Sequence, residues 1–249
     1  MDRRGFLSLA AAGAVSTAPS IPADASRVRA IAFDAFTVFD PSPVQALAMQ
    51  LFPEQGAELG KLWRLRQFEY TWLRTVMHRY TDFWKVTEDA LIYTARALKL
   101  ELGSEIRQQL MQAWLQLKAH PDAVEALRSL RKAGIRLAFL SNMTPRMLES
   151  AVGNSGLQDL FEPALSTDAV RAFKPDPRAY RMAIDAFRLK REEIVFGAFG
   201  AWDAVGARTF GYTTFWVNRQ GVAEEMLDAP PDGVGTDLKD LARFIEART

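Results

Sequence analysis

Hydrophobic residues form one short block near the start of the chain and then recur at helical spacing over a long stretch. Residues 28–33 are an apolar run ending at Asp34, which predicts a buried strand. Mixed helical spacing of apolar residues predicts three helices, over 58–80, 83–99 and 104–118. No strand-like pattern lies between about 43 and about 118, so we expect an all-helical insertion there.

After His120 the pattern alternates between strand and helix. Short apolar runs predict strands over 136–140, 164–166, 194–196 and 213–217. Helices are expected over 121–133, 145–154, 175–187 and 202–210, with a last one from about Leu238 that follows a Pro/Gly-rich loop over 228–235. Such alternation is typical of a parallel sheet covered by helices on both faces. We therefore predict an α/β core of residues 26–42 and 119–249, with a helical cap domain of residues 43–118 inserted after the first strand.

The first 25 residues differ from the rest of the chain. Arg3 and Arg4 precede a short apolar run, and small and proline-rich residues follow, ending at Ala23-Asp24-Ala25. These features in this order predict a secretory signal peptide, and the paired arginines indicate the twin-arginine route of export. We therefore expect a periplasmic protein with no membrane attachment once the signal is removed. A disordered, mildly basic tail is the simpler alternative.

Composition narrows the chemistry that the chain can perform. The net charge is +1, so no strong field favours nucleic acid, and none is expected as a partner. Cysteine is absent, which excludes disulfides and thiolate catalysis, and the two histidines, His78 and His120, leave little for a histidine-based metal site. Any reaction must therefore depend on carboxylates, lysines, arginines and hydroxyls.

Polar residues lie where the predicted strands end. Asp34 follows the first strand, Ser141 and Asn142 end the strand over 136–140, and Lys174 and Asp203 follow two later strands. Ligands of open parallel sheets bind beyond the carboxyl ends of the strands. We therefore expect these side chains to meet in one crevice covered by the helical insertion.

This arrangement resembles the haloacid dehalogenase superfamily, and in detail its type II, or L-2-haloacid, dehalogenases. The segments that carry the resemblance are 31–36 (IAFDAF), 62–64 (LWR), 69–74 (EYTWLR), 87–91 (TEDAL), 140–142 (LSN), 173–176 (FKPD), 201–204 (AWDA) and 215–219 (FWVNR). The ordered set extends over nearly all of residues 28–247. It implies a Rossmann-like parallel sheet, a helical cap, a small 2-haloacid as substrate, no metal or other cofactor, and a homodimer.

Asp34 is the expected nucleophile. A carboxylate with a pKa of about 3.9 is ionised at neutral pH and can attack carbon without a base. Displacement would give an ester on Asp34, which water then hydrolyses. Superfamily phosphatases place a second aspartate two residues after the nucleophile, whereas this chain has Phe36, which cannot protonate a leaving alkoxide. Simple turn capping by Asp34 and core packing by Phe36 are the structural alternatives.

The resemblance implies a role for each of the other polar residues. Lys174 would offset the repulsion between two anions, nucleophile and substrate, in a site of low dielectric constant. Ser141 would donate to the substrate carboxylate, and Arg64 from the cap would receive the departing halide together with Asn142. Asp203 is the remaining expected catalytic residue. The other expected substrate-binding residues are Thr37 and Tyr180 among the polar ones and Phe36, Phe68, Phe83 and Trp202 as apolar lining, with ordinary core packing a nearly equal reading for Phe68 and Phe83.

The chain departs from the family pattern at two places. The loop after Asp34 is one residue shorter, with Thr37 as the substitute hydroxyl, and Ala198 and Gly200 stand where the family has a serine and an asparagine. These departures concern ester hydrolysis and leave two other hypotheses open. One is a magnesium phosphatase of the same fold, and the other is a weakly active periplasmic protein that binds small carboxylates.

Overall fold

A six-stranded sheet forms the centre of the molecule in a computed structural model that describes residues 27–162 and 164–248. Its strand order is β5-β4-β1-β6-β7-β8, and every neighbouring pair is parallel. The strands are β1 (Ala30–Phe33), β4 (Arg136–Ser141), β5 (Leu165–Ser166), β6 (Ile194–Ala198), β7 (Thr213–Val217) and β8 (Gly233–Gly235). The predicted α/β fold with a parallel sheet is confirmed.

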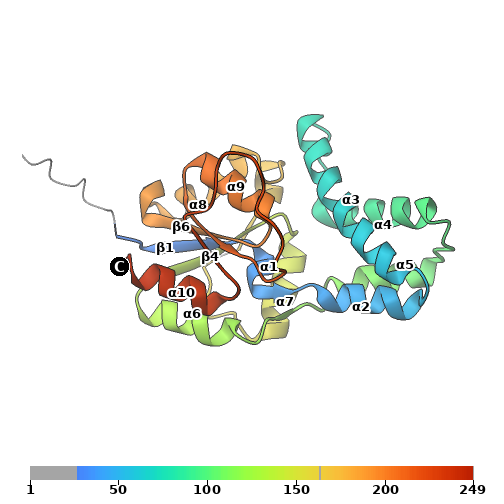
Figure 1. Ribbon diagram of the computed structural model, residues 1–249, viewed down its shortest axis with the longest axis horizontal. Coiled ribbons are helices and arrows are strands. Elements are labelled where there is room, and N and C mark those ends of the chain that lie inside the picture. Colours follow the sequence, from blue (N-terminus) through green and yellow to red (C-terminus); the bar gives the residue numbers. More distant parts are fainter. Residues whose placement is uncertain (1–26, 163, 249) are drawn as a thin grey trace, which may run out of the picture.

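Both faces of the sheet are buried, which explains why the strands are apolar without alternation. Successive side chains of β1 point to opposite faces, so Ile31 and Phe33 belong to one core cluster and Ala30 and Ala32 to the other. The first cluster is completed by α6 (Ala123–Lys132), α7 (Pro145–Ser155) and α10 (Leu238–Glu246). The second is completed by α8 (Pro177–Phe187) and α9 (Ala201–Phe210). Figure 1 shows these two helical layers on either side of the strands.

The strand register brings the predicted polar residues to one edge. Phe33 at the end of β1 pairs with Phe139 of β4 and with Gly197 of β6. The residues that follow these positions therefore lie at the same edge of the sheet, beside α1 (Ala35–Val38), the single turn after Asp34.

Four helices form a separate layer to one side of the core (Figure 1). They are α2 (Ser42–Leu51), α3 (Gly56–Val76), α4 (Phe83–Ala97) and α5 (Ser104–Ala113). The chain leaves the core at β2 (Phe39–Asp40) and returns at β3 (Lys118–Ala119), and these two short strands pair antiparallel. Two 3₁₀ turns, η1 (Thr167–Val170) and η2 (Arg191–Glu193), complete the elements.

Helix α2 and strand β8 escaped the sequence analysis, as did the two-residue strands β2 and β3. Helix α2 buries only Val44 and Ala48, so its apolar stripe is too narrow to be recognised. It packs against the start of α3, where a Cβ on Gly56 would lie 2.3 Å from the Ala48 carbonyl oxygen. Strand β8 lies in the segment that we expected to be a loop, because its sequence, Gly-Val-Gly, has no strand signal.

Two helices are shorter than their patterns predict. Helix α3 ends at Val76, not at 80, because His78 adopts a left-handed conformation with φ of 54°. Helix α5 ends at Ala113, and a turn separates it from β3.

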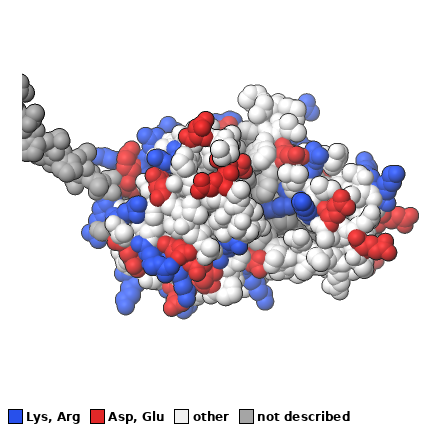
Figure 2. Space-filling model, viewed as in Figure 1, with Lys and Arg blue, Asp and Glu red and all other residues white. Residues whose placement is uncertain are grey.

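Acidic and basic side chains are interspersed on the face drawn in Figure 2, which agrees with the small net charge. Across the described parts of the chain, no helix combines the length and apolar character that crossing a membrane requires.

Candidate active site

Asp34 is held firmly at the end of β1. Its backbone N–H donates to the Gly197 carbonyl (2.9 Å), and its Oδ1 accepts from the Phe36 N–H (2.9 Å). The residue is only 7% exposed. Asp34 thus does cap the turn, as the simpler alternative required, but its second oxygen remains for another partner.

That partner is Lys174, which bridges two carboxylates. Its Nζ lies 2.7 Å from Asp34 Oδ2 and 2.5 Å from Asp203 Oδ2, and the lysine is fully buried. Burial alone would lower the pKa of Lys174, but the charges of Asp203 and Asp34 outweigh it and raise that pKa above its ordinary value. The ammonium is therefore a fixed positive charge beside the expected nucleophile.

Asp203 lies in the first turn of α9 and is 1% exposed. Burial, helped by the charge of Asp34 and opposed by Lys174, raises the pKa of the Asp203 carboxyl to about 6. The Tyr180 hydroxyl donates to Asp203 Oδ1 (2.7 Å) and is itself fully buried. We expected Tyr180 to bind substrate, but its hydroxyl is committed to Asp203, so its part in the site is to hold that carboxylate.

Ser141 and Asn142 reach the same edge from the end of β4. The Asn142 side-chain oxygen accepts from the Lys174 backbone N–H (3.0 Å) and from the Thr167 hydroxyl (3.3 Å), so it fixes the lysine loop. Ser141 Oγ accepts from the Met143 N–H (3.1 Å), which leaves its own hydroxyl proton for a ligand.

Arg64 enters from the cap helix α3. Its Nη1 donates to Gln67 Oε1 (2.6 Å), whereas Nη2 is shielded from solvent and has no hydrogen-bond partner among the described residues. Burial lowers the pKa of Arg64 to about 10, and the nearby charge of Asp34 opposes this shift. A buried, charged and unpartnered N–H donor is a place where a small anion would be stabilised.

Aromatic rings enclose this guanidinium on one face of α3. Arg64, Phe68 and Trp72 are spaced by four residues and share that face. Phe68 lies 4.4 Å from the Arg64 guanidinium carbon, and the Trp202 ring packs against Phe68 (5.2 Å) and Trp72 (5.5 Å). Phe68 and Trp202 are thus where the sequence analysis expected them, on the apolar wall between cap and core.

Comparison with known proteins agrees with this geometry. The model of the haloacid dehalogenase-like hydrolases matches residues 28–211. The chain belongs to this family. It is 41% identical over 220 residues to an (S)-2-haloacid dehalogenase of Pseudomonas sp. strain YL, a match that covers 88% of this chain and 95% of that one.

Solved structures give the same assignment. An L-2-haloacid dehalogenase superposes with a TM-score of 0.87 at 44% identity, covering 89% of this chain and all of the other. The L-2-haloacid dehalogenase of Xanthobacter autotrophicus with chloropropionic acid covalently bound superposes with a TM-score of 0.80 at 34% identity, again covering 89% and 100%.

Within this dehalogenase fold, two of the expected substrate-binding residues are corrected. Thr37 is fully buried, and its hydroxyl donates to the Asp34 carbonyl (2.6 Å), so it stabilises the turn and has no proton left for substrate. Phe83 is 1% exposed and packs against Phe173 (6.2 Å between ring centroids), which makes it a core residue.

Ala198, the last residue of β6, and Gly200, which precedes α9, stand where the family has polar side chains, and both lie in a closely packed part of the site. Ala198 is fully buried. A Cβ on Gly200 would lie 2.8 Å from the Trp202 indole nitrogen, so the tryptophan ring occupies the space of the absent side chain. Water activation must therefore rely on other groups.

Three residues of the site were missed by the sequence analysis. Gln67, fully buried, joins Arg64 to the Thr87 hydroxyl (2.6 Å), and Trp114 and Phe199 pack against the Phe36 ring. The spacing of Gln67, three residues after Arg64 on a helix, was a usable signal. Trp114 and Phe199 had none, since only tertiary packing brings them to Phe36.

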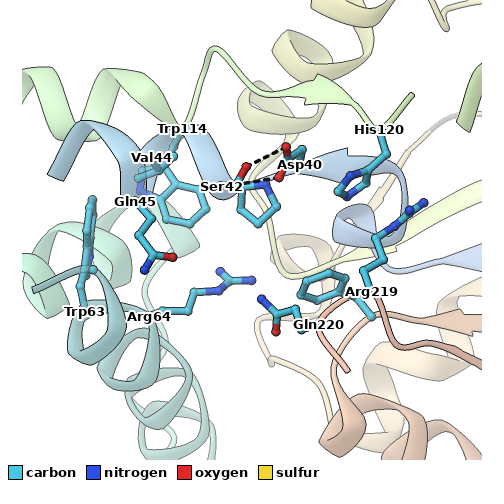
Figure 3. A pocket seen from close by; sticks show the side chains of 13 residues that line it. Asp40, Ser42, Val44, Gln45, Trp63, Arg64, Trp114, His120, Arg219 and Gln220 are labelled. Atoms are coloured by element: carbon cyan, nitrogen blue, oxygen red, sulfur yellow. Dashed lines mark hydrogen bonds between the residues drawn. The ribbon is translucent and has the colours of Figure 1, made fainter. Parts of the chain in front are cut away.

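A cavity of about 270 Å³ adjoins Arg64 at the junction of cap and core (Figure 3). Asp40, Ser42, His120, Arg219 and Gln220 contribute polar groups to its wall, and Asp34 is not among its lining residues. In residues 27–162 and 164–248, no cluster of three or more histidine, aspartate and glutamate side chains is placed to bind a metal ion.

Proposed function

We propose that the chain hydrolyses small (S)-2-haloacids to (R)-2-hydroxy acids through an ester on Asp34. The observation that carries the proposal is the Lys174 ammonium, 2.7 Å from Asp34 and 2.5 Å from Asp203, beside a phenylalanine where phosphatases have their acid. The similarity to an (S)-2-haloacid dehalogenase and to an L-2-haloacid dehalogenase supports it.

The first step is a displacement at C2. A carboxylate oxygen of Asp34 attacks C2, the new C–O bond forms as the carbon–halogen bond breaks, and the halide leaves with the bonding electrons. Arg64 Nη2 is the buried donor available to that anion. The Ser141 hydroxyl and Lys174 offset the negative charge of the substrate carboxylate. Attack from the side opposite the halide inverts C2.

The second step is hydrolysis of the ester. Water adds to the Asp34 carbonyl carbon and one of its protons passes to Asp203. The tetrahedral intermediate then collapses, the bond between that carbon and the ester oxygen breaks, and the leaving alkoxide takes the second water proton, which gives the hydroxy acid and restores the Asp34 carboxylate. Burial raises the pKa of Asp203 to about 6, which makes it a better proton acceptor than an ordinary aspartate. The C2–O bond formed first is retained, so the inversion is retained too. The covalent chloropropionic acid in the Xanthobacter structure supports an ester route.

The test is halide release. Purified protein and Asp34→Asn are incubated with (S)-2-chloropropionate and with chloro-, bromo- and fluoroacetate, and free halide and product chirality are measured. We expect (R)-lactate and one chloride per turnover from the unaltered protein and none from Asp34→Asn. No release from any of the four acids would reject the proposal.

Ala198 and Gly200 favour a second candidate function, a binding protein for small carboxylates. At these two positions the chain lacks the polar side chains that the family has where the ester is hydrolysed. A chain that neither attacks C2 nor hydrolyses an ester would act as a reversible binding protein for small carboxylates. Mass spectrometry after mixing with substrate separates the cases. A stable ester on Asp34 means attack without turnover, and unmodified protein with reversible binding means a binding function alone.

Export is a further part of the proposal. Residues 1–25, which carry the predicted twin-arginine signal, lie outside the described residues, and the family match begins at residue 28. We expect the chain in the periplasm, with its mature start near Ser26. N-terminal sequencing of the periplasmic protein and retention of an Arg3→Lys/Arg4→Lys variant in the cytoplasm test this.

We also propose a homodimer formed through the cap. Leu65 and Leu73 of α3 are each 50% exposed and Tyr93 of α4 is 45% exposed, so apolar surface is available on two neighbouring cap helices. Light scattering of the purified protein, with a Leu65→Glu/Leu73→Glu variant as comparison, measures the oligomeric state.

A further inference from the structure

Arg219 contacts the turn that follows the nucleophile, although it lies at the far end of the family motif 215–219 and has no role in the steps above. Its Nη2 and Nε donate to the Thr37 carbonyl at 2.9 and 3.2 Å. The side chain is 12% exposed and follows β7, 182 positions along the chain from Thr37. Two donors therefore converge on one buried carbonyl of α1.

The rest of that turn is bonded internally or to the cap connection. The Thr37 N–H and hydroxyl both donate to the Asp34 carbonyl (3.1 and 2.6 Å), and the Val38 carbonyl accepts from the His120 N–H (2.8 Å). The Thr37 carbonyl is satisfied by Arg219. Since the same turn places the Phe36 N–H on Asp34 Oδ1, the orientation of the carboxylate depends on where this turn is held.

Asp122 in turn fixes Arg219. The two side chains form a paired contact, Nη1 to Oδ1 at 2.9 Å and Nη2 to Oδ2 at 2.8 Å. Asp122 Oδ2 also accepts from the Leu238 N–H (2.8 Å) at the start of α10. The two parallel bonds to Asp122 fix the orientation of the planar guanidinium, so that its Nε and Nη2 point at the Thr37 carbonyl.

We propose that Arg219 is a positioning residue for the displacement step, which acts by fixing the turn that aims the Asp34 carboxylate at C2. The inference rests on the proposed function. The loop after Asp34 is one residue shorter than in the family and Thr37 uses its hydroxyl within the turn, so Arg219 supplies the side-chain contact that holds this turn from outside. Arg219 lines the edge of the cavity beside Arg64, but its Nε, Nη1 and Nη2 all donate to Thr37 and Asp122, so its effect is on the geometry of the turn.

The competing explanation is purely structural. In that case Arg219 joins β7 to α6 and α10 through Asp122, and its loss lowers stability alone. Arg136 offers a matched control, because it also forms a paired contact with a carboxylate, Glu162 (2.6 and 2.8 Å), and donates to a backbone carbonyl, that of Phe187 (2.6 Å). That carbonyl lies at the end of α8, outside the site.

The experiment compares Arg219→Met, Arg219→Lys and Arg136→Met in the full chain. Rapid-quench mass spectrometry gives the rate of ester formation on Asp34 against (S)-2-chloropropionate concentration, and thermal unfolding gives Tm. For Arg219→Met we expect an ester-formation rate lower by about 10–100-fold with half-saturation changed by no more than about twofold, the cost of a misplaced reacting group. Arg219→Lys, which keeps a donor, recovers part of the rate.

Arg136→Met is expected to lower Tm and leave the ester-formation rate unchanged. An Arg219→Met protein that loses Tm but forms the ester at the unaltered rate overturns the inference, and so does an equal loss of rate in Arg136→Met. If the unaltered protein forms no ester and releases no halide, the proposed function itself has failed, and that result is distinct from either.

Discussion

The Arg64 guanidinium carbon lies 4.2 Å from the centroid of the Phe36 ring. Arg64 comes from the cap and Phe36 from the turn after the nucleophile, so a cation of one layer rests on an aromatic ring of the other. The ring face attracts the cation and excludes water from it, and Nη2 has no hydrogen-bond partner in the part of the chain that the structure describes. The halide side of the site is therefore prepared by residues of two separate layers.

Replacing Arg64 should affect turnover far more than folding. In Arg64→Met the departing halide loses its buried donor, and we expect kcat to fall by about 10²–10³-fold, as when one donor to a developing anion is removed. Inhibition by added chloride should weaken as well. Arg66→Met is the control, because Arg66 lies on the same helix in a half-exposed pair with Glu69. Equal kcat in the two variants would contradict the role of Arg64.

Lys174 is expected to stabilise the fold as well as the reaction. In Lys174→Met, the buried carboxylates of Asp34 and Asp203 lose their common partner, and removing one member of a buried ion pair costs about 3–5 kcal/mol. Adding Asp203→Asn to this variant removes one of the two uncompensated charges and should recover part of the loss. Urea unfolding of the single and double variants measures both effects, and a double variant less stable than Lys174→Met would contradict this account.

The titration of the buried Asp203 carboxyl should be detectable in the pH dependence of the free energy of unfolding. Burial raises its folded-state pKa to about 6, above the value in the unfolded chain. Between about pH 4 and 6 the native state then holds a proton that the unfolded state has released, so the contribution of Asp203 to stability falls as pH rises through that window.

Asp203→Asn removes this dependence. The difference in unfolding free energy, variant minus unaltered protein, should therefore rise from pH 4 to 6 and level off above. Urea unfolding at four pH values between 4 and 7 measures it, and a flat difference would show that the buried carboxyl does not titrate in this range.

Any side chain at position 200 is expected to displace the Trp202 ring and the aromatic rings that pack against it. A Cβ there would meet the Trp202 ring at 2.8–3.3 Å, and Trp202 is itself held by Phe68 and Trp72. We expect Gly200→Ala to lower kcat/KM by about tenfold, on the scale of overpacking a filled site. Gly153→Ala is the matched control, because nothing lies within 4 Å of its added Cβ in α7. An unchanged kcat/KM in Gly200→Ala would mean that the position of the Trp202 ring does not matter for the reaction.

The core of the fold was predictable because its signals are local. Apolar runs mark five of the six strands of the central sheet, all except β8, and helical patterns alternate with them along the chain, which is typical of a parallel sheet. Strand β8 and helix α2 were not predicted, because their sequences carry no such local signal. Gly233 and Gly235 carry no strand preference and pair with β7 through the backbone, and α2 buries too few residues to show a period.

The site residues likewise differ in whether local sequence signals could predict their roles. Asp34, Lys174 and Asp203 stand at strand and loop ends that the sheet brings together, so their meeting follows from topology. Thr37, Phe83 and Tyr180 were correctly placed near the site but wrongly assigned to substrate, because the direction of a hydroxyl or a ring depends on neighbours distant in sequence. The contact between Arg219 and Thr37 is of this kind and could not be deduced from residue order.

The paired strands β2 and β3 are the path by which the chain leaves the core and returns to it. Everything between them, including Arg64 and the aromatic residues of α3, is one uninterrupted stretch of sequence, whereas the attacking carboxylate and its lysine belong to the remainder. Exchange of this stretch at β2 and β3 would replace the arginine that faces the leaving halide, while the attacking carboxylate, its lysine and the Phe36 ring beneath the arginine would stay with the core.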